Sequence, residues 1–300
     1  MNNDDMFPKD STEDILFNSL NEQGYIFQEA CKYELSKSNI NWSVKASEYP
    51  VSIMGQDTKI DLVLQNNDIF ALVECKRADP VYTSWLFAEL EPGKRNYSIC
   101  QVLSIECLSS SSNTTKIINR KIEEKEFDVD AYIAKSFVEV KDHSIHAGNK
   151  QINQMNGNSL RRNSNPQNIE NAFGQVLRGL SAFALEQLSQ RFKSNETFRI
   201  FFIPIVVTTA SLYLAHYKAQ DISLTNGKID RNNVVFGQQG NSLEKQNWVL
   251  VNYGASENIA LSSIPDGYVG TEPNELLKKY KMRSIFVVNS THLTEFFKKF

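Results

Sequence analysis

Several features that would assign this chain to a familiar class are missing from its sequence. The longest apolar run, Ile200 to Val207, is interrupted by Pro204 and is far too short to span a bilayer. The first residues are acidic and polar, so we expect no signal peptide and no association with a membrane. No glycine-rich phosphate loop is present, and a nucleotide cofactor is therefore not indicated.

Cysteine pairs that could bind zinc and an excess of basic charge are also missing. The four cysteines, Cys31, Cys75, Cys100 and Cys107, include no CxxC pair, which argues against a structural zinc site or a disulfide framework. A reducing, cytoplasmic location is the simplest expectation. The net charge of -3 argues against a protein that coats nucleic acid non-specifically, but it leaves room for a local basic cleft.

The N-terminal third of the chain predicts helices followed by an antiparallel meander. Ser11–Asp14 has the form of a capping box, and a second helical stretch runs from about Ile26 to Lys37. The extended segment Ile40–Ile53 precedes "IDLVLQNNDIFALVECKR" (Ile60–Arg77), in which two apolar runs flank an Asn-Asn-Asp break. This order predicts three consecutive strands.

The later segments predict a long helix and a buried strand. Asn168–Leu188 is amphipathic, with its apolar side chains on one face. Phe198–Thr209 is nearly all apolar, as in a strand that is covered on both sides. Two more strands, "NWVLVNY" and "RSIFVVN", and a closing helix, "THLTEFFKKF", are expected near the C-terminus.

These elements predict one mixed α/β domain that spans the whole chain. The regular pattern fades after Pro80, which indicates an insertion, and the Asn/Gln-rich end of this insertion is expected to be a mobile loop. The expected division is a core at about 11–80 and 168–217, an insertion at about 81–167, and a C-terminal elaboration at about 218–300.

The hairpin within Ile60–Arg77 is expected to gather charged side chains on one face. With Asn67 and Asp68 as the turn, counting outward places Asp61 opposite Glu74, with Cβ atoms about 4.5–5.5 Å apart. Lys76 shares this face, because side chains alternate along a strand. Moving the turn back by one residue keeps both acids on the same face, whereas a three-residue loop would separate them.

Two adjacent carboxylates and a nearby lysine suggest metal-assisted chemistry. The carboxylates repel each other unless a cation lies between them. Oxygen ligands of this kind suit Mg²⁺ or Mn²⁺. Lys76, two residues beyond Glu74, could reach a water or a phosphate at such a cation. These are the parts required for hydrolysis of a phosphodiester bond.

Ile60-Asp61, a gap of a dozen residues and Glu74-Cys75-Lys76 on an apolar strand together resemble the PD-(D/E)XK, or restriction-endonuclease-like, nuclease superfamily. The resemblance covers about Ser11–Pro80 and Asn168–Ala210. It implies a core of a helix, a three-strand meander, a second helix and a further strand. Ile60 stands where the family has proline, a frequent departure that does not touch the chemistry.

The resemblance also implies roles for individual residues. Asp61 and Glu74 would bind the metal, together with the backbone carbonyl of Cys75, and Lys76 would position or activate a water. Many members carry a further metal-binding glutamate on the first helix, for which Glu29 is the candidate.

A subset of the family carries a glutamine on the second helix that positions the substrate, and Gln175 is the match. Gln175 shares a helical stripe with Asn171 and Arg178. A solvated surface is the alternative for this stripe, so whether it faces the cleft stays open.

The expected function is Mg²⁺- or Mn²⁺-dependent, endonucleolytic hydrolysis of DNA, with double-stranded DNA as the partner. "VECKRADP", Trp85 and the "QVLRG" helix resemble uncharacterised bacterial members, some of which are associated with defence against foreign DNA. A double-strand cut would need a homodimer or two visits, because one hairpin supplies one site. The alternatives are a non-cleaving nucleic-acid-binding or assembly subunit and a ribonuclease.

Other acids remain open as alternatives to this site. "VEVKD" places Glu139 and Lys141 after Asp130, and "EEK" offers Glu123 and Lys125, although neither follows a strand–turn–strand pattern.

Asp57 is a further rival acid, because it lies four residues before Asp61 on the same face of the predicted strand. The hairpin could also be a solvated edge with a salt bridge. The apolar run "FALV" before Glu74 indicates burial instead.

Overall fold

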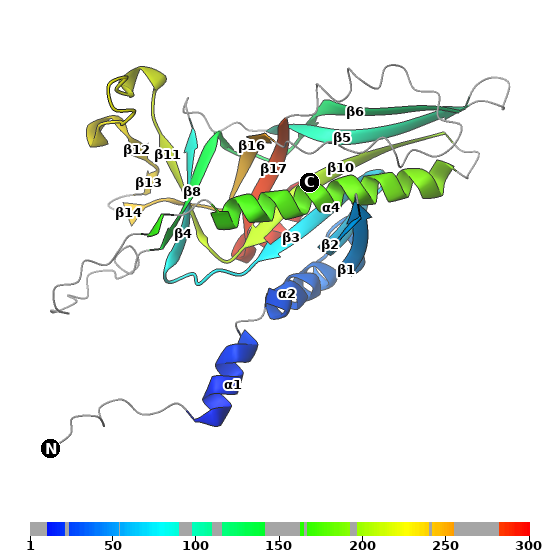
Figure 1. Cartoon of the computed structure of the whole chain (residues 1–300), viewed down its shortest axis with the longest axis horizontal. Coiled ribbons are helices and arrows are strands. Elements are labelled where there is room, and N and C mark those ends of the chain that lie inside the picture. The colour runs from blue at the N-terminus through cyan, green and yellow to red at the C-terminus, as the bar shows by residue number, and fades with distance from the viewer. Residues whose placement is uncertain are drawn as a thin grey trace.

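A nine-stranded mixed sheet lies at the centre of the fold, with helices on both of its faces (Figure 1). The protein therefore has the mixed α/β architecture that its sequence predicts. The computed structural model describes residues 11–21, 24–53, 55–89, 98–109, 116–141, 163–164, 167–192, 197–239, 242–254 and 282–300.

The predicted meander forms one edge of this sheet. Strands β1 (Ser43–Ile53), β2 (Gln56–Asn66) and β3 (Ile69–Lys76) pair antiparallel in chain order. Asn67 between β2 and β3 has a φ of 52°, in the left-handed region that asparagine tolerates better than most residues. The turn that the sequence predicts at this point is confirmed.

The buried strand β10 (Phe198–Thr208) extends the sheet beyond the meander. It runs parallel to β3 on one side and to β17 (Met282–Asn289) on the other, and β16 (Trp248–Gly254) follows antiparallel to β17. Apolar side chains cover both faces of β10, as its composition predicts. The segment expected to elaborate the core therefore contributes two strands to the central sheet.

The segment at 81–167 adds strands to the same sheet. β5 (Ser98–Ser109) pairs antiparallel with β10 and with β6 (Lys116–Phe127), and β7 (Ile133–Ala134) pairs with β16. The expected mobile loop at 148–168 lies outside the described residues, apart from a short strand and the first turn of the helix that follows.

A second sheet leaves the first where β3 ends. Its centre is β4 (Thr83–Glu89), which lies between β8 (Ser136–Lys141) and β11 (Ser211–His216). The other short elements are β9 (Asn163–Ser164), β12 (Val235–Phe236), β13 (Gln238–Gln239), β14 (Ser242–Leu243), β15 (Lys245–Gln246), η1 (Ala219–Asp221), η2 (Arg231–Asn233) and η4 (Ser290–His292).

Helices cover the two faces of the central sheet. The predicted amphipathic helix is α4 (Gln167–Phe192), which packs on one face, while α2 (Gly24–Lys37) and α6 (Leu293–Lys299) pack on the other. Within the described part of the chain, no helix is both long and apolar enough to cross a membrane. The predicted apolar face of α4 is buried at Ile169, Phe173, Val176, Leu177 and Leu180.

The short helix α1 (Thr12–Asn21) projects from the body of the molecule (Figure 1). The predicted capping box is formed: the Asp14 N–H donates to Ser11 Oγ at 3.1 Å, and the Ser11 N–H donates to Asp14 Oδ2 at 3.1 Å.

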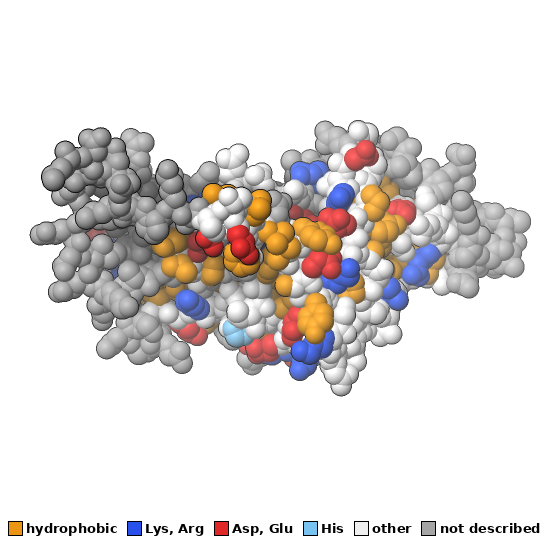
Figure 2. Space-filling model, turned by 90° about the horizontal axis from the view of Figure 1, so that it is seen from below, with side chains coloured by type: hydrophobic (Ala, Val, Ile, Leu, Met, Phe, Trp, Pro, Cys, Tyr) orange, Lys and Arg blue, Asp and Glu red, His pale blue; other side chains and the backbone are white. Residues whose placement is uncertain are grey.

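Apolar, acidic and basic side chains lie side by side on the face shown in Figure 2. The exposed apolar side chains of α1 are Ile15, Leu16, Phe17 and Leu20.

Helix α4 lies directly against β2 at Gly179. A Cβ atom at this position would lie 2.8 Å from Cγ1 of Ile60, closer than a side chain can pack. Ile60 is buried and immediately precedes Asp61. The glycine therefore allows α4 to lie against the strand that carries the first candidate acid.

We expect Gly179→Ala to lower the free energy of unfolding by about 1–3 kcal/mol, because the added methyl overpacks the contact with Ile60. In an Ile60→Ala background the same substitution should cost nothing, since the clashing atom is gone. Denaturant unfolding of the four proteins in this cycle measures the coupling. Gly174→Ala is the control, because its new methyl would meet only the flexible end of Arg178. An equal cost in both backgrounds would contradict the proposed contact.

Candidate functional site

The pairing of β2 with β3 brings the two predicted acids to neighbouring positions on adjacent strands. The cross-strand pairs begin at the turn, with Asn66 opposite Ile69, and continue without a shift to Leu62 opposite Val73, the residues next to Asp61 and Glu74. Asp61 and Glu74 are the next residues on the two strands. The predicted register is therefore confirmed as far as the pair that comes before the two acids.

The side chain of Asp61 reaches across to β3. Its Oδ2 atom accepts a hydrogen bond from the Cys75 N–H at 2.7 Å. From the other face of the sheet, Nε2 of the buried Gln28 donates to the main-chain carbonyl of Asp61 at 3.0 Å. Burial raises the pKa of the Asp61 carboxyl, and the hydrogen bond from Cys75 and the Lys76 charge offset only part of this rise.

Glu74 is almost fully buried, with 6% of its surface exposed. Burial raises the pKa of its carboxyl to about 7, and the nearby charge of Asp61 adds to the rise. The charges of Lys76 and Arg178 act in the opposite direction. The negative charge of Asp61 therefore disfavours ionisation of Glu74.

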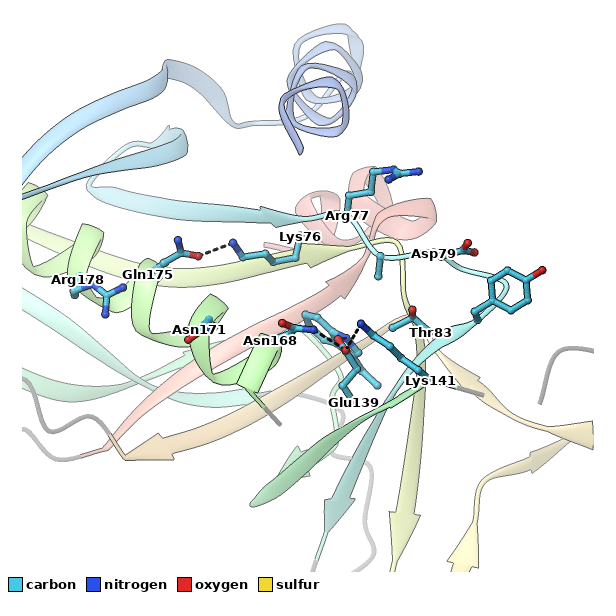
Figure 3. Close-up of a pocket in the computed structure, with 13 residues that line it drawn as sticks. Lys76, Arg77, Asp79, Thr83, Glu139, Lys141, Asn168, Asn171, Gln175 and Arg178 are labelled. Atoms are coloured by element: carbon cyan, nitrogen blue, oxygen red, sulfur yellow. Dashed lines mark hydrogen bonds and ion pairs between the residues drawn. The ribbon is translucent and has the colours of Figure 1, made fainter. Parts of the chain in front are cut away.

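Lys76 connects the acids to helix α4. Its Nζ atom lies 2.7 Å from Oε1 of Glu74 and donates to Oε1 of Gln175 at 2.5 Å (Figure 3). The side chain of Lys76 is 30% exposed. The stripe of α4 that carries Gln175 therefore faces the site, which decides the question that the sequence left open.

A cavity of about 650 Å³ begins at Lys76 and lies between the end of β3, α4 and the strands β4 and β8 (Figure 3). Asp61 and Glu74 are not among its lining residues, so Lys76 is the direct link between the acids and the cavity. The lining residues are Lys76, Arg77, Ala78, Asp79, Tyr82, Thr83, Trp85, Glu139, Lys141, Asn168, Asn171, Gln175 and Arg178.

Glu29, the predicted additional metal ligand, forms a different contact. Its carboxylate lies 3.3 Å from Nζ of Lys32, and both side chains are more than a third exposed. In the described structure no hydrogen bond or ion pair joins Glu29 to Asp61 or Glu74. The neighbouring Gln28, which the sequence analysis did not single out, is a residue of α2 that touches the site.

The residues of the alternative motif, Asp130, Glu139 and Lys141, lie at two different cavities. Asp130 accepts from Nζ of Lys299 at 2.6 Å and lines a second cavity of about 240 Å³ together with Trp248. Glu139 and Lys141 line the larger cavity instead. The three residues therefore do not form one site.

Glu139 is a buried anchor between a strand and a helix. Its Oε2 accepts from Nε1 of Trp85 at 3.2 Å, and its Oε1 accepts from Nδ2 of Asn168 at 2.7 Å. Nζ of Lys141 lies 3.3 Å from Oε1. These contacts connect β4, β8 and the first turn of α4.

The remaining alternatives have other surroundings. Nζ of Lys125 lies 3.8 Å from the ring centroid of Phe201, and the side chain of Glu123 is outside the described part of the structure. Asp57 is exposed and lies opposite Ser52, near the far end of the β1–β2 pair.

Arg178 is a second contributor that the sequence indicated only by its position. It lies three residues after Gln175 on α4 and lines the same cavity. Helical spacing could have grouped these two residues, but only the packing of α4 on the sheet places Arg178 near Glu74.

Comparisons of the chain with protein-family models, curated proteins and solved structures found no match. The described residues also contain no group of three or more His, Cys, Asp or Glu side chains that could hold a metal ion. The two carboxylates, the lysine and the cavity are the functional features that the described residues present.

The raised pKa of Glu74 predicts a dependence of stability on pH. The folded state favours the protonated carboxyl, so its contribution to stability is fully present below the unfolded pKa of 4.5 and is lost as pH rises through about 7. Relative to Glu74→Gln, the free energy of unfolding of the native protein should fall by up to about 3 kcal/mol between pH 5 and pH 8. Denaturant unfolding in chelator at several pH values measures this difference, and a constant difference would refute the assignment.

Proposed function

We propose that this protein is a metal-dependent nuclease that hydrolyses phosphodiester bonds of DNA within the strand. The observation that supports this proposal is the cluster of Asp61, Glu74 and Lys76. The half-buried Asp61 and the buried Glu74 lie on adjacent strands of a hairpin, and the lysine joins Glu74 to a cavity.

The order of elements supports a restriction-endonuclease-like core. Helix α2, the meander β1–β2–β3, helix α4 and strand β10 follow in the expected sequence, and β10 lies parallel to β3. The acids and the lysine lie on the last two strands of the meander, near helix α4.

The donor set fits a magnesium or manganese ion. One oxygen of each carboxylate has a hydrogen-bond or ion-pair partner, Cys75 for Asp61 and Lys76 for Glu74. The second carboxylate oxygen of each acid, together with the main-chain carbonyl of Cys75, would be left to bind the metal ion. Mg²⁺ commonly takes one or two carboxylates and completes its shell with waters and substrate phosphates. When bound, it would supply a Lewis acid and a water of lowered pKa.

Lys76 would act as the donor that orients the reacting groups. Its ammonium is already held between Glu74 and Gln175, so its position is set before a substrate arrives. From there it could donate to a water or to a phosphate oxygen. Gln175 would be a positioning residue, whereas the contact of Glu29 with Lys32 gives no support to Glu29 as a ligand.

DNA is the proposed partner because the cavity has more cationic than anionic side chains. Phosphate contacts depend mainly on such cations. A double-strand cut would need two copies or two visits. The cations in the lining are Lys76, Arg77, Lys141 and Arg178, and the anions are Asp79 and Glu139.

A matched pair of substitutions on β2 tests the metal site. Asp61→Asn should reduce single-turnover cleavage at least 100-fold in Mg²⁺, because it removes a metal-binding charge without changing the size of the side chain. Asp57→Asn, four residues away on the same strand and exposed, should cleave like the native protein. Both variants should unfold cooperatively.

Chelation and metal exchange complete this test. The native protein should cleave DNA with Mg²⁺ or Mn²⁺ and be silent in chelator. Undiminished cleavage in chelator would exclude the mechanism. Absence of cleavage of DNA and RNA with either metal would favour the non-cleaving subunit.

The shape of the donor at position 76 is tested by Lys76→Arg. The ammonium lies 2.7 Å from Glu74 and 2.5 Å from Gln175, a gap that suits a compact donor better than a planar guanidinium. We expect cleavage to fall nearly as far as in Lys76→Ala, while DNA binding at fixed salt stays within about threefold. The control is Lys59→Arg, on the exposed part of β2. Near-native cleavage by Lys76→Arg would leave only an electrostatic role for Lys76.

A further inference from the structure

The cavity beyond Lys76 contains polar groups that the proposed hydrolysis does not use. Only Lys76 and Gln175 belong to the catalytic cluster, yet the cavity extends to β4 and β8 of the second sheet. Its volume of about 650 Å³ lies within the range of roughly 300–1,000 Å³ found for pockets that hold small ligands. A concavity of this size accepts a single nucleotide, whereas a double helix is too wide to enter it.

One wall of the cavity is a stripe of amide and guanidinium side chains on α4. Asn168, Asn171, Gln175 and Arg178 are spaced so that they fall on one helical face, and all four line the cavity (Figure 3). Amide side chains both donate and accept hydrogen bonds, which suits the edge of an unpaired base.

The second sheet provides a cation, and the turn that leads into β4 provides an aromatic ring. Lys141, from β8, is 54% exposed and is oriented by its ion pair with the buried Glu139. Lys76 enters the same cavity from β3, so ammonium groups from two different sheets line it. The ring of Tyr82 is 40% exposed at the cavity and offers a surface on which a base can stack.

The rigidity of this wall distinguishes it from a solvated surface. Glu139 is held by the indole N–H of the fully buried Trp85 and by the side chain of Asn168. Lys141 therefore lies against a carboxylate that is itself held by two elements, and it shares the cavity with Lys76. Two cations in one cavity fit a ligand that carries more than one phosphate.

We propose that this cavity binds one unpaired nucleotide of the substrate strand, next to the phosphate held at Lys76, with Lys141 on the neighbouring phosphate. The inference rests on the proposed nuclease function and narrows its substrate. The preferred DNA has an unpaired nucleotide at the cut position, as in a single strand or an overhanging end, and is not a blunt, fully paired duplex.

Equilibrium binding in chelator tests the cavity without any cleavage. The probes are a fluorescent DNA hairpin with three unpaired nucleotides at its 3′ end and the same hairpin with a blunt end. The native protein should bind the overhang at least tenfold more tightly. Lys141→Ala should remove most of this preference and lower the slope of log K against log salt by about 0.7, the value for one contact to a single strand.

Two further variants keep the test specific. Asn171→Ala should also reduce the preference for the overhang, but without a change in the salt slope, because it removes no charge. Lys135→Ala is the control: this lysine is exposed between β7 and β8 and does not line the cavity. Equal affinity for the two hairpins, or the same result for Lys141→Ala and Lys135→Ala, would overturn the proposal.

The outcomes also separate this proposal from the proposed function. Overhang binding that depends on Lys141, without cleavage in Mg²⁺ or Mn²⁺, would support the nucleotide-binding site and contradict the proposed nuclease function. Metal-dependent cleavage that requires Asp61, with binding indifferent to Lys141, would remove the nucleotide site alone.

Discussion

The candidate site depends on the register between β2 and β3. If β2 slid by one residue along β3, as a three-residue loop would require, Asp61 would turn to the opposite face of the sheet, away from Glu74. The turn at Asn67 sets this register, and the hydrogen bond from the Cys75 N–H to Asp61 holds the acid where the cross-strand pairs end. Gln28 adds a contact from the opposite helix layer. The position of Asp61 is therefore determined by the strand pairing and by both of these contacts.

Burial makes this pairing of acids energetically unfavourable, and the surroundings compensate for only part of the cost. The pKa of both carboxyls is raised, and the Lys76 charge lowers neither to its ordinary value. The buried Glu74 in contact with Lys76, with the half-buried Asp61 nearby, is more consistent with a place where charge changes during function than with a structural salt bridge. A divalent cation beside Asp61 and Glu74 would favour their charged forms.

The second sheet gives the site its cavity. Because β4 leaves the central sheet directly after β3, it can pair with β8 in front of the first turns of α4. Glu139 then joins these three elements through Trp85 and Asn168. The pair Glu139 and Lys141, which resembles the motif in sequence, thus lies beside the candidate site as part of a wall.

Local patterns in the sequence predicted the elements outside 81–167 but not the strands β4 to β8 within it, and packing decided which side chains meet. The hairpin, its register, the amphipathic helix and the buried strand depend on residues close together in the chain, so spacing was enough to predict them. The contacts of Gln175 with Lys76, of Gln28 with Asp61 and of Asn168 with Glu139 join distant segments, and no local period encodes them. Only tertiary structure could decide them, because the face that a helix stripe presents depends on how the helix packs against the sheet.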